Sequence, residues 1–183
     1  MPAGLPGTRS PPLPRLPVLI GIVSDTHGFL HPDLARTFDG ADLILHAGDV
    51  GGPRGAEAVL GALREVAPVR AVFGNADGPE MRRDLPEHER FEAGGLRFWM
   101  THIGGRPGRW EKGIGPQLRE DTPDVFVTGH SHILRVERVA RLDGMLFVNP
   151  GAAGRQGFHQ VKTCLRLRVD DGKAHQAEVV ELP

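Results

Sequence analysis

The 183-residue sequence has a single cysteine, almost no net charge and no long apolar run. Cys164 alone cannot form an internal disulfide and is typical of a reducing compartment, so we expect a cytoplasmic protein. A membrane-spanning helix needs about 20 apolar residues, and no stretch approaches that length, so we expect no membrane association. A net charge of -1 provides no basic field for binding long nucleic acid.

The amino-terminal stretch lacks hydrophobic periodicity. Residues 1–17 contain six prolines and lack the apolar core of a secretory signal. We expect this segment to be a disordered, Pro-rich arm. Two alternatives stay open: an arm that packs on a neighbouring subunit, and a start codon assigned too early. Residues 18–183 have the length and composition of one globular domain.

Strand and helix patterns alternate in the first half of the chain. Continuous apolar runs predict buried strands at 18–23, 42–46 and 69–73. Apolar residues at helical spacing predict helices at 31–38 and 55–66. This β-α-β-α-β order is typical of a parallel sheet with right-handed crossovers.

The second half is rich in strands. A hairpin is predicted around Ala93-Gly94-Gly95, between strands 90–92 and 96–101. Residues 104–116 are predicted to be a loop, followed by a short helix near 117–120. Later strands are expected to be antiparallel, at 124–128, 135–139, 145–148, 161–169 and 174–181. An α/β half followed by a β-rich half predicts two sheets packed face to face with helices outside.

Polar residues follow the predicted strands at regular intervals. Along the chain they are Asp25 and His27, Asp49, Asn75, His102, and finally His130 and His132. The steps from Asp25 onward are 24, 26, 27 and 28 residues. Because one strand-helix-strand unit takes about 30 residues, each step returns the chain to the same sheet edge.

These residues form a donor set with metal-binding chemistry. Two carboxylates, one amide and four imidazoles, without a thiolate, suit Mn²⁺, Fe²⁺, Zn²⁺, Ni²⁺ or Co²⁺ better than Ca²⁺. Seven side chains are too many for one such ion and sufficient for two that share a carboxylate. Two ions about 3.5–4 Å apart are the usual clamp for attack on a phosphate ester.

Each element alone also has an ordinary structural explanation. Asp25 and His27 could cap a helix, Gly48-Asp49 and Gly74-Asn75 could be turns, and His102 could be a hydrogen-bonded core residue. Two imidazoles two residues apart in Gly129-His130-Ser131-His132 have few structural uses. The regular spacing of all five elements favours the metal-site interpretation.

The series D-x-H, G-D, G-N-x-D, H and G-H-x-H resembles the signature of the calcineurin-like metallophosphoesterase superfamily. The short chain and the Asn149-Pro150-Gly151 segment are most similar to its small, single-domain YfcE-type phosphodiesterase group. The resemblance covers about residues 18–155 and implies a four-layer αββα sandwich, with two mixed β-sheets flanked by helices. Dimers are common in this family, so a homodimer is the expected assembly.

The resemblance also implies a dinuclear centre of two divalent ions, with Mn²⁺ as the first expectation. One ion would be held by Asp25, His27, Asp49 and His132, and the other by Asp49, Asn75, His102 and His130. Asp49 would bridge the ions, and a metal-bridging hydroxide would attack phosphorus in line. Asn75, Asp49 and His102 are then the catalytic candidates. Asn75 and Arg155 are candidates for binding the phosphoryl oxygens of a small phosphate-ester substrate.

Two positions depart from the family pattern. Many members have a histidine that protonates the leaving group where this chain has Ala76. We therefore predict a preference for good leaving groups, unless His31 or His159, both expected at the surface, supplies the proton. Ile103 replaces a small residue after His102 and is expected to reshape the pocket rim.

An enzyme is not the only function that such a chain could have. The alternative is a non-catalytic binding or scaffold protein on the same fold, as in the retromer subunit of this superfamily. A scaffold would be expected to have lost ligands, whereas all seven are present here. A metal-dependent phosphodiesterase or phosphatase is therefore the favoured hypothesis.

Overall fold

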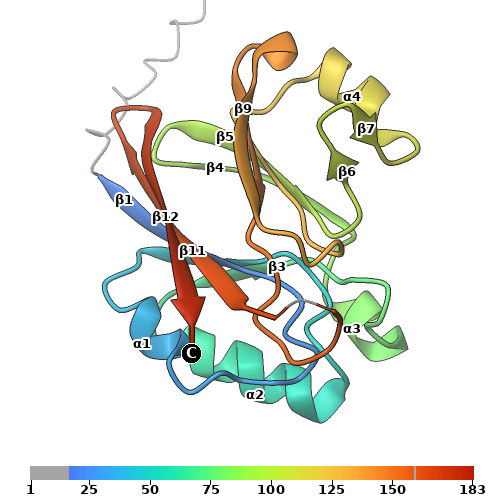
Figure 1. Ribbon diagram of the computed structural model, residues 1–183, viewed down its shortest axis with the longest axis vertical. Coiled ribbons are helices and arrows are strands. Elements are labelled where there is room, and N and C mark those ends of the chain that lie inside the picture. The colour runs from blue at the N-terminus through green and yellow to red at the C-terminus, as the bar shows by residue number, and fades with distance from the viewer. Residues whose placement is uncertain (1–16, 159) are drawn as a thin grey trace, which may run out of the picture.

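Two five-stranded sheets form the centre of the computed structural model, which describes residues 17–158 and 160–183 (Figure 1). In order across the first sheet, the strands are β12 (Lys173–Leu182), β11 (Lys162–Asp170), β1 (Val18–Val23), β2 (Leu43–His46) and β3 (Val69–Ala71). Those of the second are β4 (His88–Ala93), β5 (Leu96–Thr101), β8 (Val125–Val127), β10 (Met145–Asn149) and β9 (Arg135–Val139).

Both sheets are mixed. In the first, β1, β2 and β3 are parallel, and β11 pairs antiparallel with both β1 and β12. In the second, β5, β8 and β10 are parallel, while β4 and β9 form antiparallel outer pairs. The carboxyl ends of the parallel strands therefore meet along one edge of each sheet, where ligands gather in such folds.

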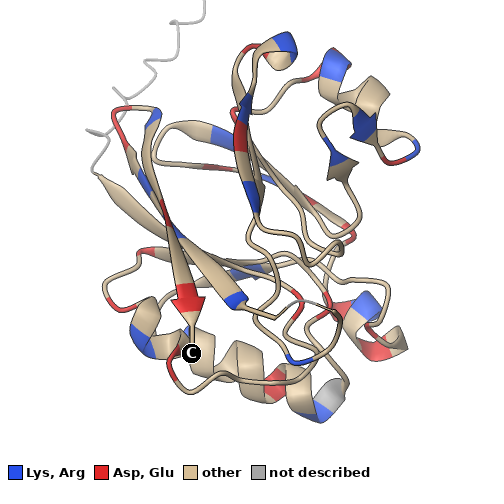
Figure 2. Ribbon diagram, in the orientation of Figure 1, with Lys and Arg blue, Asp and Glu red and all other residues tan. Residues whose placement is uncertain are grey.

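Short helices cover the outer faces (Figure 1). They are α1 (Leu34–Thr37), α2 (Pro53–Arg64), α3 (Pro79–Asp84), α4 (Ile114–Glu120) and the 3₁₀ helix η1 (Ala140–Leu142). A two-stranded ribbon, β6 (Gly105–Arg106) and β7 (Arg109–Trp110), lies next to α4. Acidic and basic residues are interspersed along both sheets (Figure 2). No helix within the described residues is long and apolar enough to cross a membrane.

Three buried apolar clusters hold the layers together. Ile22 of the first sheet and Met100 and Val127 of the second belong to the cluster between the sheets. Phe38 and Leu63 belong to the cluster between the first sheet and α1 and α2. The third lies between the second sheet and α4, and it includes Trp99, Leu118 and Phe147. These clusters confirm the predicted four-layer order of helices, sheet, sheet and helix.

Most predicted strands are confirmed, and several elements need correction. The stretch 104–116, expected to be a loop, contains β6, β7 and the first turn of α4. Helix α3 was not predicted, although Pro79 is well suited to the first helical position. Strand β10 pairs parallel with β8, so the carboxyl-terminal third is not wholly antiparallel. The predicted arm lies almost entirely outside the described residues.

Candidate metal centre

The structure brings the predicted ligands together at the carboxyl ends of the strands. Asp25 and His27 follow β1, Asp49 follows β2, and Asn75 follows β3. The second sheet contributes His102 after β5, and His130 and His132 after β8. Two overlapping groups have their ligand atoms within 4.8 Å of one another, namely Asp25, His27 and His132, and Asp25, Asp49 and His102.

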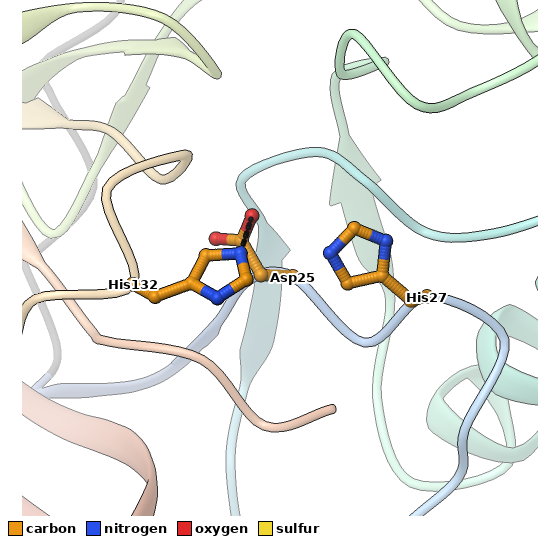
Figure 3. Close-up of side chains that lie close together, drawn as sticks. All are labelled: Asp25, His27 and His132. Carbon is orange, nitrogen blue, oxygen red and sulfur yellow. Dashed lines mark ion pairs between the residues drawn. The ribbon is translucent and has the colours of Figure 1, made fainter. Parts of the chain in front are cut away.

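The first group is centred on Asp25. Its Oδ1 atom lies 3.1 Å from Nε2 of His132, and Figure 3 shows these two side chains facing each other. His27 reaches the same space from the chain just after β1 (Figure 3). Its Nε2 atom lies 3.9 Å from Oδ2 of Asp49. The Asp25 carboxylate is fully buried, so two imidazoles and one carboxylate line a small polar space.

The second group is centred on His102. Its Nε2 atom lies 3.2 Å from Oδ2 of Asp49 and 3.9 Å from Oδ1 of Asp25. Asn75 joins this group, because its Oδ1 atom lies 3.2 Å from the same Nε2 atom. The His130 ring is 5.3 Å from the His102 ring, centroid to centroid. Both carboxylates therefore lie between the imidazoles of the two groups.

The backbone at these positions is unusual. Asp25, His27, Asp49, His130 and His132 all have positive φ angles, between 50° and 66°. Only two other described non-glycine residues, Asp143 and Asp171, have positive φ angles, and both lie in turns beside strands. Left-handed backbone is unfavourable for residues with a Cβ and persists where the surroundings enforce it. Its concentration at five of the seven predicted ligands indicates a functional site.

Hydrogen bonds fix the orientation of the central side chains. Nδ1 of His102 lies 2.7 Å from the carbonyl oxygen of Ala47, which directs Nε2 toward the carboxylates. Oδ2 of Asp25 accepts hydrogen bonds from the Ser24 hydroxyl at 2.6 Å and the His130 amide at 3.1 Å. Oδ1 of Asp49 accepts one from the Ala76 amide at 2.8 Å. One oxygen of each carboxylate is thus held, and the other faces the imidazoles.

Two glycines allow the loops to approach this closely. A Cβ atom at Gly74 would lie 2.1 Å from Oδ1 of Asp49. A Cβ atom at Gly129 would lie 2.0 Å from the Ser24 hydroxyl oxygen. Both distances are far below van der Waals contact, so the G-N-x-D and G-H-x-H motifs require glycine for steric reasons.

Asp77 supports the site without facing it. Its carboxylate accepts hydrogen bonds from the amides of Val50, Gly51 and Gly74, at 3.2, 2.8 and 2.8 Å. It therefore ties the loop after β2 to the loop after β3. The only signal for this role in the sequence was its position at the end of the G-N-x-D motif.

Ser24 and Asn149 were not predicted as supports. Asn149 is buried at the end of β10, and its Nδ2 atom donates to the Gly129 carbonyl at 2.8 Å and to the Ser131 hydroxyl at 3.1 Å. It thereby braces the loop that carries His130 and His132. The strand-end position of each residue, beside a motif, was the only signal in the sequence.

Other histidines and Arg155 have varied outcomes. His31 is buried and its Nε2 atom lies 2.7 Å from the Pro183 carbonyl oxygen, so the expectation of a surface histidine was wrong. His46 is buried, and its Nε2 atom lies 2.9 Å from the Thr26 hydroxyl oxygen, so it is a hydrogen-bonded core histidine. Arg155 is exposed and its guanidinium lies 3.9 Å above the Phe29 ring. His159 lies outside the described residues.

The electrostatics of the cluster favour a cation. Burial is the largest single influence on Asp49 and acts to raise its pKa. The hydrogen bond and charge interaction with His102, the Ala76 amide and the nearby His27 together outweigh burial and hold the pKa below its usual value. Burial acts to lower the pKa of His102, yet Asp49 and Asp25 hold it above its usual value. The hydrogen bond to Asp25 raises the pKa of His132. Each shift shows that positive charge is stabilised beside the two carboxylates.

The donor atoms also fit metal ions. Nε2 of His27 is buried and has no hydrogen-bond partner among the described residues. A buried polar atom without a partner is unfavourable, and a metal ion would satisfy it. Carboxylate oxygens and imidazole nitrogens are the ligands preferred by divalent transition ions. The residues present therefore fit the metals that the sequence implied.

Comparisons with known proteins find relatives in sequence and in fold. A probable metallophosphoesterase of Methanothermobacter thermautotrophicus is 31% identical over 175 residues, which span 89% of this chain and 92% of that protein. Vps29 of Entamoeba histolytica, in a structure complexed with zinc, has 22% identity and a TM-score of 0.64; the match covers 91% of this chain and all of that one. A predicted phosphoesterase from Streptococcus pneumoniae has 21% identity and a TM-score of 0.62, with 91% and 98% covered.

These two structural likenesses, both under 25% identical, bear on the fold, and they confirm the predicted pair of mixed sheets. The family model described as the calcineurin-like phosphoesterase superfamily domain matches residues 18–172. That range contains every predicted metal ligand and both sheets apart from β12. With its motifs, its fold and this match, the chain belongs to the calcineurin-like phosphoesterase superfamily.

Proposed function

We propose that the protein is a dinuclear metal-dependent phosphodiesterase acting on a small phosphate ester. The observation that carries this proposal is the pair of overlapping ligand groups, with two carboxylates lying between two sets of imidazoles. Divalent ions bound there would supply an activated water nucleophile and withdraw charge from the phosphoryl oxygens. Mn²⁺ is our first candidate; Ni²⁺, Fe²⁺, Zn²⁺ and Co²⁺ suit the same donors.

The assignment of ligands follows the sequence motifs. Asp25, His27, Asp49 and His132 would hold one ion, and Asp49, Asn75, His102 and His130 the other. The 3.2 Å contact between Asp49 and His102 and the 3.9 Å distance between Asp49 and His27 support a bridging role for Asp49. Asp25 belongs to both ligand groups, so its carboxylate would contribute negative charge to the binding of both ions.

The substrate phosphoryl group would bind beside the same residues. Asn75 is exposed at the end of its loop, and its amide nitrogen is free to turn toward a phosphoryl oxygen. The exposed guanidinium of Arg155 is our second candidate for this contact. Its stacking on Phe29, which follows His27 closely in the chain, keeps it near the site.

Proton supply to the leaving group is the weak point of this site. Ala76 cannot donate a proton, and the Asp77 carboxylate is occupied by three backbone amides. His31 is occupied by the Pro183 carbonyl. With these residues excluded as acids, the enzyme should favour esters whose leaving groups need no proton.

The test compares bis-p-nitrophenyl phosphate with p-nitrophenyl phosphate, each assayed with Mn²⁺, Ni²⁺, Zn²⁺ and Co²⁺. We expect metal-dependent hydrolysis that favours the diester and that chelation by EDTA abolishes. A protein that binds two ions per chain and hydrolyses neither ester with any metal would contradict the proposal. The non-catalytic scaffold hypothesis would then be favoured. The cytoplasmic location and the homodimer stay predictions.

A further inference from the structure

A cavity of about 670 Å³ opens beside His130, outside the ligand cluster itself. The residues that give it chemical character are Arg106, Arg109, Trp110, Glu111, His130 and Arg135. Its volume is typical of small-molecule sites and too small for a macromolecule. Because His130 is one of the proposed metal ligands, a group bound in this cavity would adjoin the reacting phosphate.

The charge of the cavity is mainly positive. Arg135 is paired with Glu137 at 2.6 Å between Nε and Oε1, which neutralises it. Arg106 and Arg109 are exposed cross-strand neighbours on the β6–β7 ribbon, and their side chains form no ion pair or hydrogen bond within the described residues. Figure 2 shows basic residues on both strands of the ribbon. One acidic residue, Glu111, opposes them.

The cavity also has an aromatic wall that is fixed in place. The Trp110 ring lies 5.9 Å from the Phe126 ring and 5.8 Å from the Phe147 ring, centroid to centroid. These contacts anchor the half-buried tryptophan on the apolar cluster between the second sheet and α4. A flat group can pack against such a wall while its charge reaches the arginines.

A second cavity, of about 470 Å³, shares His130, Ser131 and Ile133 with the first. It continues to Phe158, whose side chain is exposed. The segment 130–133 therefore lines two cavities beside the same proposed metal ligand, and only the first of them contains arginines. Two substituents on one phosphorus would each have a place, which is the arrangement that a diester requires.

We call the first cavity, which the β6–β7 ribbon lines, the ribbon cavity. We infer that it is a specificity subsite for phosphodiesters in which one ester substituent is flat and carries a second negative charge. Arg106 and Arg109 would bind that charge, and Trp110 would contact the flat group. The other substituent would lie toward Phe158. This inference rests on the proposed phosphodiesterase function, because it names the substrate class of the same site.

The kinetic test uses two derivatives of bis-p-nitrophenyl phosphate. In one, a ring carries a carboxylate, and in the other the same position carries a neutral carboxamide. Both rings stay nitrated, so hydrolysis is detected whichever ring leaves. We expect the carboxylate to raise kcat/KM about 10-fold, because an arginine pair binds an anion through charge-assisted hydrogen bonds.

Arginine variants test whether Arg106 and Arg109 cause this preference. In the Arg106→Ala/Arg109→Ala protein the preference should fall below about 2-fold, because kcat/KM should fall more for the carboxylate than for the carboxamide. Arg119→Ala is the matched control, because Arg119 is exposed on α4 and does not line the described cavity. A wild-type protein without the preference, or a double variant that retains it, would overturn the inference.

A binding test separates this subsite from the proposed activity. Nitroaromatic rings quench tryptophan fluorescence, so 3-nitrobenzoate and 3-nitrobenzamide can be titrated into protein kept in EDTA. We expect saturable quenching with at least 5-fold tighter binding of the benzoate, and loss of that difference in the double variant. If this holds while no diester is hydrolysed, the proposed function fails, and the cavity is left as a binding site for flat anions. Equal binding of both probes to the wild-type protein would refute the subsite.

Discussion

The ligand cluster and the ribbon cavity are neighbours, yet they are built differently. The cluster lies at strand ends, and its two carboxylates are almost completely buried and held by backbone amides and a hydroxyl. The cavity carries its charge on Arg106 and Arg109, which are exposed on a short ribbon and have no polar partner in the described part of the chain. In the proposed function the strand ends hold the groups that do the chemistry, and in the inferred subsite the separate β6–β7 ribbon selects the substrate.

The contrast has a physical basis. Side chains that hold ions must keep their geometry before the ion arrives, which requires hydrogen bonds and close packing around them. Side chains that select among substrates need only exposed charge and a rigid wall. Changes in the cluster should consequently damage both activity and structure, and changes in the cavity should alter specificity alone.

The largest effect should come from Asp49→Asn, which removes the charge that faces His27 and His102. We expect kcat/KM on bis-p-nitrophenyl phosphate to fall more than about 100-fold, since losses around metal ligands already reach that size. Metal analysis should show loss of both ions. Asp39→Asn, at an exposed position after α1, is the control. Two tightly held ions in the Asp49 variant would contradict the bridging role.

Asp77→Ala tests how much the hydrogen bonds of a residue outside the ligand cluster contribute to stability. The substitution leaves three buried amides without an acceptor, so the free energy of unfolding should fall by about 3 kcal/mol or more. Urea unfolding followed by circular dichroism measures the change, with Asp39→Ala as the control. A fall below about 1 kcal/mol would show that Asp77 does not hold the two loops.

His46 tests the core beneath the cluster through its response to pH. Burial lowers its pKa from 6.5 to about 4. The unfolded chain therefore binds a proton at a higher pH than the folded protein, and stability falls as the pH drops from 6.5 toward 4. The contribution is about 3 kcal/mol. With EDTA present, His46→Gln should lose less stability on acidification than the wild-type protein; equal losses would disprove this role.

Ala76→His tests whether the proposed site lacks a proton donor for the leaving group. The new imidazole stands beside the Ala76 amide that binds Asp49 and can donate a proton to a poor leaving group. We expect the ratio of turnover on an alkyl phosphodiester to that on bis-p-nitrophenyl phosphate to rise at least about 10-fold. If the ratio does not change, protonation of the leaving group does not limit the rate.

The smallest effect should come from Glu111→Gln in the cavity. Removing the opposing charge should raise the preference for the carboxylate-bearing diester by about 3-fold and leave the free energy of unfolding unchanged. Glu120→Gln on α4 is the matched control. A comparable change in the control would show that the effect arises from net charge and not from the cavity.

The clustering of the proposed ligands could be predicted because these residues follow strong apolar strands at regular intervals. Strand β1 has the predicted bounds, and its end places Asp25 and His27 at the site. Four imidazoles at such positions have few other uses, so the pattern identified the family as well as the fold. The two sheets could be predicted for the same reason, since long apolar runs dominate local alternatives.

The parts that could not be predicted depend on contacts between distant segments. His31 is buried because the carboxyl-terminal carbonyl of Pro183 reaches it, 152 residues away. The β6–β7 ribbon could not be predicted because its strands have only two residues each, too few to show an alternation of apolar and polar residues. Asp77 has no chemical signature of its own, and its role depends on where three amides point.

The left-handed backbone at the proposed ligands sets stability against function. A glycine would relieve the strain at each of these five positions, and at His130, which is exposed, it would remove little packing. Glycine at these positions would therefore stabilise the fold and remove the proposed metal ligands. The histidines and aspartates present here keep those side chains at a cost in backbone strain.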